Sequence, residues 1–132
     1  MKTIIRNASI INEGKIIVSD VLISGDRIEK ICSEINLHSN ASYKEIDANG
    51  LYLIPGVIDD QVHFREPGLT HKATIQSESK AAVAGGITSF MDMPNTIPNT
   101  LTQALLEEKY NIASKSSLAN YSFFMGINKN NL

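Results

Sequence analysis

The sequence has very little cysteine, no tryptophan and no long apolar run. Its 132 residues include one cysteine, Cys32, so no disulfide can form within the chain, and a reducing compartment is expected. No segment approaches the roughly 20 apolar residues that a membrane-spanning helix needs. The apolar run near the N-terminus is broken at Arg6 and Asn7, which argues against a signal peptide. We therefore expect a cytoplasmic protein with no membrane partner.

An excess of basic residues is also missing. The formal net charge is -2, which argues against nucleic acid or an anionic membrane surface as a partner, because both attract a basic face. Hydrophobic residues make up 42% of the chain and charged residues 20%, which is typical of a globular chain that can build a core. The length alone is that of one ordinary domain.

The first part of the chain is rich in β-branched residues and turn signals. The expected strands are Thr3–Arg6, Ile16–Ser24, Arg27–Ile31, Tyr43–Ile46 and Leu51–Ile54. A tight hairpin is expected at Gly25, because glycine supplies the positive φ that such a turn needs. We predict a small β domain over residues 1–54, with its strands in a meander. A meander of this size buries little and must pack against something larger.

From residue 55 onward, strand patterns alternate with helix patterns. The expected strands are Val57–Ile58 with Val62–Phe64, then Ile87–Met91 and Tyr121–Gly126, and the expected helices are Ile75–Ala84 and Thr102–Ser114. The pair Gly85-Gly86 predicts the end of the first helix. This order is typical of parallel βα units and predicts an α/β fold. Three strands cannot close a barrel, so residues 55–132 predict either an open sheet or part of a larger fold.

Polar side chains gather where the first two of these parallel strands end. Gln61, His63 and Arg65 alternate with apolar residues, so a regular strand would point all three to one face. Such a row is costly to bury without partners, and a site that binds a metal and an anionic ligand would satisfy it. Asp92, Asn95 and Thr96 follow the second strand. The carboxyl ends of parallel strands are where active sites form.

The other polar residues of this region do not indicate a catalytic role. Asp59 and Asp60 are adjacent and face opposite ways, so they cannot act as a pair. We expect Asp59 at the strand end behind the site, and Asp60 in a structural role. His71 and His38 are expected in solvated loops. No Gly-x-Ser-x-Gly or Cys–His arrangement predicts a covalent nucleophile.

The two strand-end motifs resemble those of a known family. The segments Leu53–Asp59 and Val62–Gly68 are similar to the first barrel strand of dihydroorotases, in the amidohydrolase superfamily. Met91–Thr96 is similar to their second-strand motif, and Glu78–Ala84 with Gly85–Thr88 also matches in order and spacing. The resemblance covers essentially the whole chain. Allantoinases and hydantoinases share the Pro-Gly-x-Ile-Asp approach but typically lack this combination of motifs.

The resemblance implies a fold and an activity. It implies the first three βα units of a (β/α)8 TIM-type barrel over residues 55–132, preceded by a small β-sandwich-like domain over residues 1–54, in an incomplete chain. The implied activity is that of a zinc-dependent cyclic amidohydrolase, a dihydroorotase, which interconverts N-carbamoyl-L-aspartate and L-dihydroorotate in pyrimidine biosynthesis. We expect one or two zinc ions and a homodimer in the full-length protein. The family's remaining catalytic residues are expected beyond Leu132, so this chain alone is expected to be inactive.

The resemblance also assigns roles to three side chains. His63 matches a zinc ligand, and a neutral imidazole suits zinc. Arg65 and Asn95 match the residues that hold the substrate carboxylate, since a guanidinium pairs with a carboxylate through two bonds and an amide adds a neutral donor. Two structural alternatives remain open. Arg65 could form a surface or structural salt bridge, for example with Glu66, and Asn95 could serve as a turn residue between two prolines.

Gln61 departs from the family pattern. Dihydroorotases usually begin the site with His-x-His, whereas this chain has Gln61 two residues before His63. An amide oxygen is a weaker zinc ligand than imidazole, so Gln61 leaves the number of metals, and metal binding itself, open. Two alternatives follow. One is a non-catalytic dihydroorotase homologue with a structural or assembly role, and the other is a different cyclic amidohydrolase, allantoinase-like or hydantoinase-like.

Overall fold

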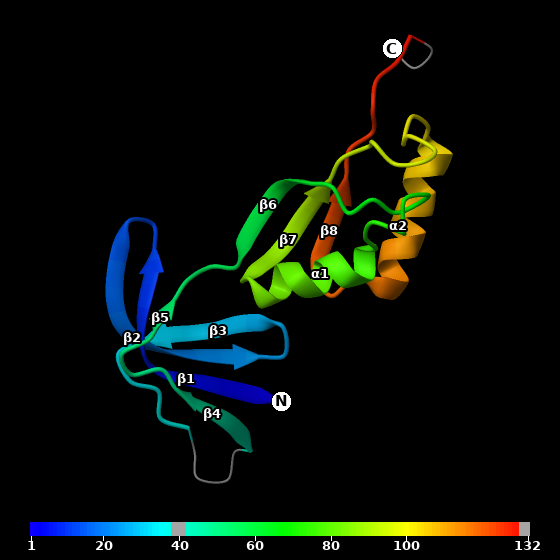
Figure 1. Cartoon of the computed structure of the whole chain (residues 1–132). Helices are drawn as coiled ribbons and strands as arrows, with labels where there is room; N and C mark the ends of the chain where they lie inside the picture. Colours follow the sequence, from blue (N-terminus) through cyan, green and yellow to red (C-terminus); the bar gives the residue numbers. More distant parts are fainter. Residues whose placement is uncertain (38–41, 130–132) are drawn as a thin grey trace. The chain divides into compact units, whose positions relative to one another are not determined.

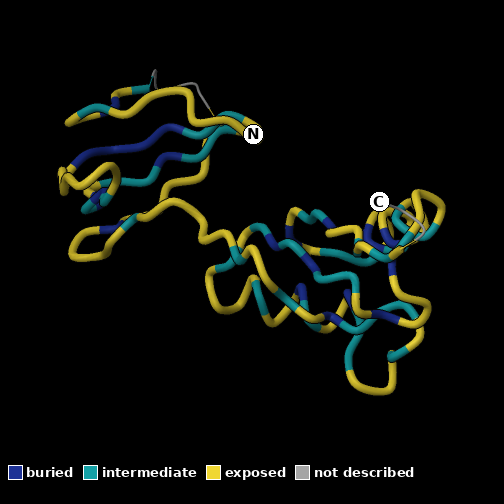
Figure 2. The backbone as a smooth tube through the Cα atoms, turned by 90° about the horizontal axis from the view of Figure 1, so that it is seen from above, coloured by how far each residue is buried: buried dark blue, intermediate teal, exposed yellow. Residues whose placement is uncertain are grey.

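The computed structural model describes residues 1–37 and 42–129, so His38 and the segment after Lys129 lie outside the described residues. The chain divides into two compact units, Met1–Pro55 and Gly56–Leu132. Buried residues form short runs in each unit, whereas most turns are exposed (Figure 2). In the described ranges, no helix is both long and apolar enough to cross a membrane.

The N-terminal unit is a five-stranded sheet (Figure 1). Its strands are β1 (Lys2–Asn12), β2 (Lys15–Ser24), β3 (Arg27–Cys32), β4 (Tyr43–Asp47) and β5 (Tyr52–Leu53). The expected meander is wrong, because β4 and β5 both pair in parallel with β1 instead of following β3. Ile35 explains this path. Its buried side chain packs with Ile4 and Leu22, which draws the chain across the sheet after β3.

Two hairpin turns set the register of this sheet. The predicted turn at Gly25 is confirmed, with φ of 62° and strands that end at Ser24 and resume at Arg27. A second turn, at Glu13 and Gly14, joins β1 to β2 with both residues at positive φ. The sequence prediction missed this second turn because β1 does not end at Arg6. The strand continues to Asn12 through an irregularity between Ile5 and Ala8.

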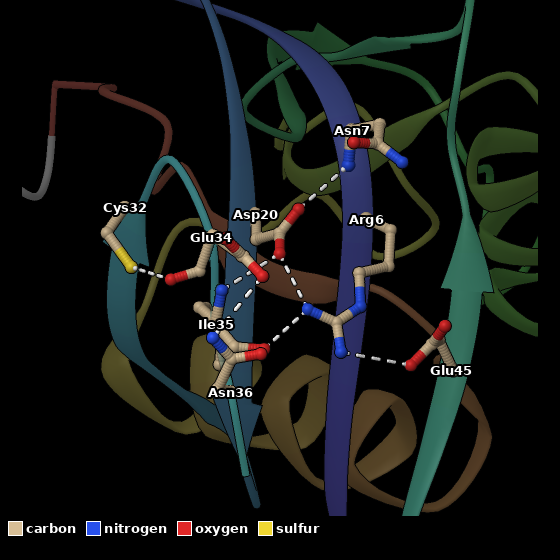
Figure 3. A network of polar contacts seen from close by, with 8 residues as sticks. All are labelled: Arg6, Asn7, Asp20, Cys32, Glu34, Ile35, Asn36 and Glu45. Carbon is tan, nitrogen blue, oxygen red and sulfur yellow. Dashed lines mark hydrogen bonds and ion pairs between the residues drawn. The ribbon is translucent and has the colours of Figure 1, made fainter.

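A buried carboxylate holds this irregularity (Figure 3). Asp20 accepts the backbone N–H of Asn7 at 3.0 Å, the backbone N–H of Ile35 at 3.0 Å and the Arg6 guanidinium at 2.7 Å. Arg6 also donates to Glu45 on β4 at 3.2 Å. Burial on its own would raise the pKa of Asp20, but the bonds from Asn7, Arg6 and Ile35 outweigh it and lower the pKa. The bond to Asp20, followed by that to Glu45, raises the pKa of Arg6.

The C-terminal unit alternates strands and helices, as the sequence predicts. Its elements are β6 (Val57–Val62), α1 (Ile75–Ala84), β7 (Ile87–Asp92), α2 (Gln103–Ser116) and β8 (Asn120–Phe123). The strands form a parallel sheet in the order β6-β7-β8, which confirms an α/β arrangement. The predicted bounds of α1 are confirmed. Helix α1 packs against β7, and α2 packs against β8 (Figure 1).

An aromatic core joins this sheet to its helices. Phe64, Phe90 and Phe123 pack with Ile75 of α1 and Ala113 of α2 in one buried cluster. The rings of Phe64 and Phe90 lie 4.4 Å apart between centroids. Because both helices contribute to one cluster, they cover the same face of the sheet, as consecutive right-handed crossovers require. The core therefore lies between the two helices and this face of the sheet.

Candidate active site

The polar row at the end of β6 differs from the sequence prediction. The strand ends at Val62, so His63 and Arg65 lie in the following loop. Gln61 and His63 are exposed, whereas Val62 and Phe64 pack toward the core. The predicted alternation of polar and apolar side chains therefore holds from Gln61 to Phe64. It stops at Arg65, whose φ of 68° turns the chain out of the extended conformation. The prediction that all three polar side chains share one face of a strand is therefore wrong for Arg65.

His63 and Asn95 meet across the ends of β6 and β7. Nδ1 of His63 lies 2.9 Å from Oδ1 of Asn95. An amide oxygen only accepts hydrogen bonds, so Nδ1 carries the proton in this contact, and in the neutral imidazole the lone pair then lies on Nε2. Metal-binding histidines are commonly oriented in this way, by a hydrogen bond from the nitrogen that does not bind the metal. Both side chains are exposed and accessible to a ligand.

Arg65 is half-buried, and its guanidinium is not engaged by the described residues. Within residues 1–37 and 42–129, it takes part in no ion pair or side-chain hydrogen bond. The alternative salt bridge to Glu66 is not formed. Glu66 instead accepts the backbone N–H of Ile75, the first residue of α1, at 2.8 Å, where a carboxylate suits the positive end of the helix dipole. The guanidinium is thus unpaired within the described residues.

The loops after β6 and β7 are held together through their backbones. The N–H of Ile97 donates to the carbonyl of Pro67 at 3.2 Å. Gly68 adopts φ of 83°, and a Cβ at this position would collide with the carbonyl oxygen of Ile97. Thr96 donates its N–H to the carbonyl of Pro94 at 2.9 Å, so Asn95 does lie in a tight turn. Its turn role and its contact with His63 therefore coexist.

A buried ion pair lies beneath these loops, and it was not predicted from the sequence. Nζ of Lys109 lies 2.6 Å from Oδ2 of Asp92, with side-chain exposures of 0% and 1%. One signal was available in the sequence. Lys109 follows Leu106 by three residues and precedes Ala113 by four, so it falls within the apolar stripe of α2. A lysine in that stripe needs a buried partner, and Asp92 at the end of β7 is that partner.

The remaining predicted residues occupy simpler positions. Asp59 accepts the backbone N–H of Gln61 at 3.1 Å, which shapes the irregular end of β6. Asp60 and Gln61 border an open groove of about 540 Å³ with Met93, Pro94, Phe124, Met125 and Ile127. His71 is exposed in its loop, as expected. Asp59 and Asp60 thus differ in environment, and neither contacts His63 through a hydrogen bond in the described ranges.

The donors present here do not by themselves make a zinc site. In the described part of the chain, no three His, Cys, Asp or Glu side chains lie close enough to hold a metal ion. His63 is a suitable nitrogen ligand, and Gln61 offers only an amide oxygen. A structural or catalytic zinc needs at least three protein ligands. Any metal bound at His63 would therefore need ligands from outside these residues.

The fold and site together define the class of protein. Parallel βα units with polar side chains at the carboxyl ends of the strands form the arrangement in which α/β enzymes build their active sites. The model of the family described as dihydro-orotase-like matches residues 50–125. The chain belongs to this family.

The relatives are cyclic amidohydrolases with different substrates in their names. The dihydroorotase of Staphylococcus epidermidis strain RP62A is 45% identical over 95 residues, covering 72% of this chain and 22% of the relative. The allantoinase of Solibacter usitatus is 36% identical over 130 residues, covering 98% of this chain and 28% of the relative. The L-hydantoinase structure from Arthrobacter aurescens superimposes with a TM-score of 0.90 at 26% identity, covering 98% of this chain and 28% of that chain. The chain thus spans about a quarter of these relatives.

Proposed function

We propose that the polypeptide containing this chain is a dihydroorotase, which reversibly cyclises N-carbamoyl-L-aspartate to L-dihydroorotate. In this proposal, Gly56–Leu132 forms the first three βα units of a (β/α)8 barrel whose remaining units come from sequence beyond this chain. The site would need zinc, with His63 as one ligand and the others outside the described residues. Bound zinc would polarise the carbonyl that undergoes attack. The catalytic base is expected beyond Leu132.

One observation carries the proposal: an unpaired guanidinium next to a histidine whose orientation is fixed. The Arg65 side chain takes part in no ion pair or hydrogen bond with the described residues, while His63 is held by Asn95, which in the neutral imidazole leaves the lone pair on Nε2. A guanidinium binds a carboxylate through two parallel hydrogen bonds, and both the open and the cyclic form of the proposed substrate carry a carboxylate. Arg65 would bind this group, and the amide nitrogen of Asn95 would add a neutral donor.

The test is turnover by the full-length polypeptide. N-carbamoyl-L-aspartate and L-dihydroorotate should interconvert in the presence of zinc, whereas allantoin and an uncharged hydantoin should react far more slowly. Allantoin and hydantoin are the informative comparisons, because the relatives include an allantoinase and a hydantoinase structure. A preference for an uncharged ring substrate would contradict the dihydroorotase proposal and favour another cyclic amidohydrolase activity. No turnover of any of these compounds would remove it.

A non-catalytic role is the second candidate, and Gln61 is the observation that favours it. Gln61 offers an oxygen where imidazole would bind zinc more strongly. Metal analysis of the full-length polypeptide separates the two candidates, since stoichiometric zinc with Gln61 in place counts against a non-catalytic homologue. Gln61→His should strengthen zinc binding, as measured by competition with a chelator. If the variant gains turnover that the natural sequence lacks, the non-catalytic candidate is favoured.

A further inference from the structure

The buried pair of Lys109 and Asp92 makes contacts with both loops of the site. We propose that this pair is a positioning device, which sets the separation of the loop that carries His63 and Arg65 from the loop that carries Asn95. The kinetic part of this inference rests on the proposed function. The structural part does not rest on the proposed function, because amide hydrogen exchange of the two loops can be measured without any substrate.

The first contact reaches the loop after β6. Oδ1 of Asp92 accepts the backbone N–H of Phe64 at 2.8 Å in a buried position. Phe64 is the residue between His63 and Arg65, so this bond fixes the main chain at the point where the two side chains diverge. The backbone carbonyl of Val62 also accepts the N–H of Met93 at 3.0 Å, next to Asp92 in sequence. The end of β6 is thereby tied to the end of β7.

The second contact reaches the loop after β7. Nζ of Lys109, which lies 2.6 Å from Oδ2 of Asp92, donates to the carbonyl of Met93 at 3.1 Å. Met93 lies two residues before Asn95. The ammonium also lies 4.8 Å from the centroid of the Phe123 ring, an arrangement that favours a cation. One side chain of α2 therefore holds the end of β7 against the core and supports the carboxylate that holds the loop after β6.

The burial of this pair makes its geometry strict. Buried ion pairs often contribute little net stability compared with apolar residues of similar size, but a buried charge that loses its partner is strongly penalised. Movement of either loop away from α2 would lengthen a bond to a charged group from which water is excluded. The loop after β6 and the loop after β7 are consequently held at one preferred distance from each other. This separation is the one at which Nδ1 of His63 meets Oδ1 of Asn95 at 2.9 Å.

The experiment compares three variants of the full-length polypeptide. Lys109→Met leaves the Asp92 carboxylate buried without its cation. The double variant Asp92→Asn with Lys109→Met removes both charges, keeps an amide oxygen that can accept from Phe64, and loses the bond to Met93. Lys115→Met, an exposed position on the same helix, is the matched control. Each variant is measured for its thermal midpoint, for KM and kcat with N-carbamoyl-L-aspartate, and for amide hydrogen exchange in peptides covering residues 63–68 and 93–98.

If the pair positions the loops, the double variant should regain thermal stability without regaining substrate binding. Its thermal midpoint should recover most of the loss seen in Lys109→Met, because no charge is left unpaired. Its KM should remain about tenfold higher than in the natural sequence, and kcat should change less than KM. Amide hydrogen exchange over residues 93–98 should remain about tenfold faster than in the natural sequence. Both magnitudes are those expected for loss of a hydrogen bond from a charged donor. Lys115→Met should leave all of these values unchanged.

A purely structural role predicts a different pattern. If KM and loop exchange return to their natural values together with the thermal midpoint, the pair only balances its own charges and the positioning proposal is overturned. If Lys109→Met does not fold, the double variant decides, since it has no unpaired charge. If the natural polypeptide has no turnover, the proposed function fails, while exchange over residues 93–98 still decides the positioning proposal.

Discussion

The imidazole of His63 and the side-chain amide of Asn95 are 32 residues apart in sequence, yet Nδ1 and Oδ1 lie 2.9 Å from each other. The contact joins the carboxyl ends of β6 and β7, and it assigns the proton of the histidine to Nδ1. The orientation of the proposed metal ligand therefore depends on a residue that sequence comparison alone assigns to substrate binding.

Asn95→Ala should weaken zinc binding as well as substrate binding. Loss of the amide oxygen frees the imidazole to rotate and change tautomer, and such outer partners typically contribute about 10- to 100-fold to metal affinity. Chelator competition on the full-length polypeptide measures the change. Asn99→Ala, at an exposed position in the same loop, is the control. Unchanged zinc affinity in Asn95→Ala would show that the contact does not orient a ligand.

Arg65→Met should raise KM for a carboxylate substrate. The variant keeps an apolar stem but loses the charged donors, and hydrogen bonds to charged groups are worth enough to change affinity by about 10- to 100-fold. Steady-state kinetics with N-carbamoyl-L-aspartate provide the measurement, and Lys72→Met, at an exposed position in the same loop, is the control. Retained affinity for the carboxylate substrate would exclude Arg65 as its clamp.

Gly68→Ala should destabilise the protein more than Gly86→Ala. Both glycines have positive φ, at 83° and 88°, so both substitutions carry a backbone cost of about 1 to 2 kcal/mol. Only at Gly68 would the added Cβ also collide with Ile97, whereas the space around Gly86 is open. The steric part should add roughly 1 to 3 kcal/mol. Thermal unfolding of the two variants measures the difference, and equal midpoints would mean that the two loops separate freely.

The network around Asp20 should make the stability of the N-terminal unit depend on acid. The pKa of Asp20 is lowered in the folded chain. At a pH between the folded and the unfolded pKa of Asp20, the unfolded chain therefore binds more protons than the folded chain. The stabilisation is fully present above the unfolded value of about 3.9 and is lost as pH falls through the lowered folded pKa. Asp20→Asn should reduce stability at neutral pH and flatten this acid dependence in urea unfolding followed by circular dichroism.

Asp26→Asn is the control for that experiment, because the Asp26 side chain is 93% exposed. It should leave both the stability and its pH dependence close to those of the natural sequence. An acid dependence in Asp20→Asn as steep as in the natural sequence would place its origin elsewhere in the unit.

Local features of this protein were determined by the sequence alone. The bounds of α1, the positive φ at Gly25 and the alternation of strand and helix after Gly56 follow from residue preferences over a few neighbouring positions. The residues at the carboxyl ends of β6 and β7 were also identified from sequence, because the order of parallel βα units dictates where loops gather. Such features need no knowledge of distant contacts.

Only the tertiary structure decided how distant residues meet. The parallel pairing of β4 with β1 depends on Ile35 entering the core, and the left-handed turn at Arg65 ends an alternation that looked continuous in sequence. The pair of Lys109 and Asp92 is separated by 17 residues and closes within 2.6 Å. A buried charge is tolerated only where a partner of opposite charge arrives from another element, and that arrival is a property of the packed fold.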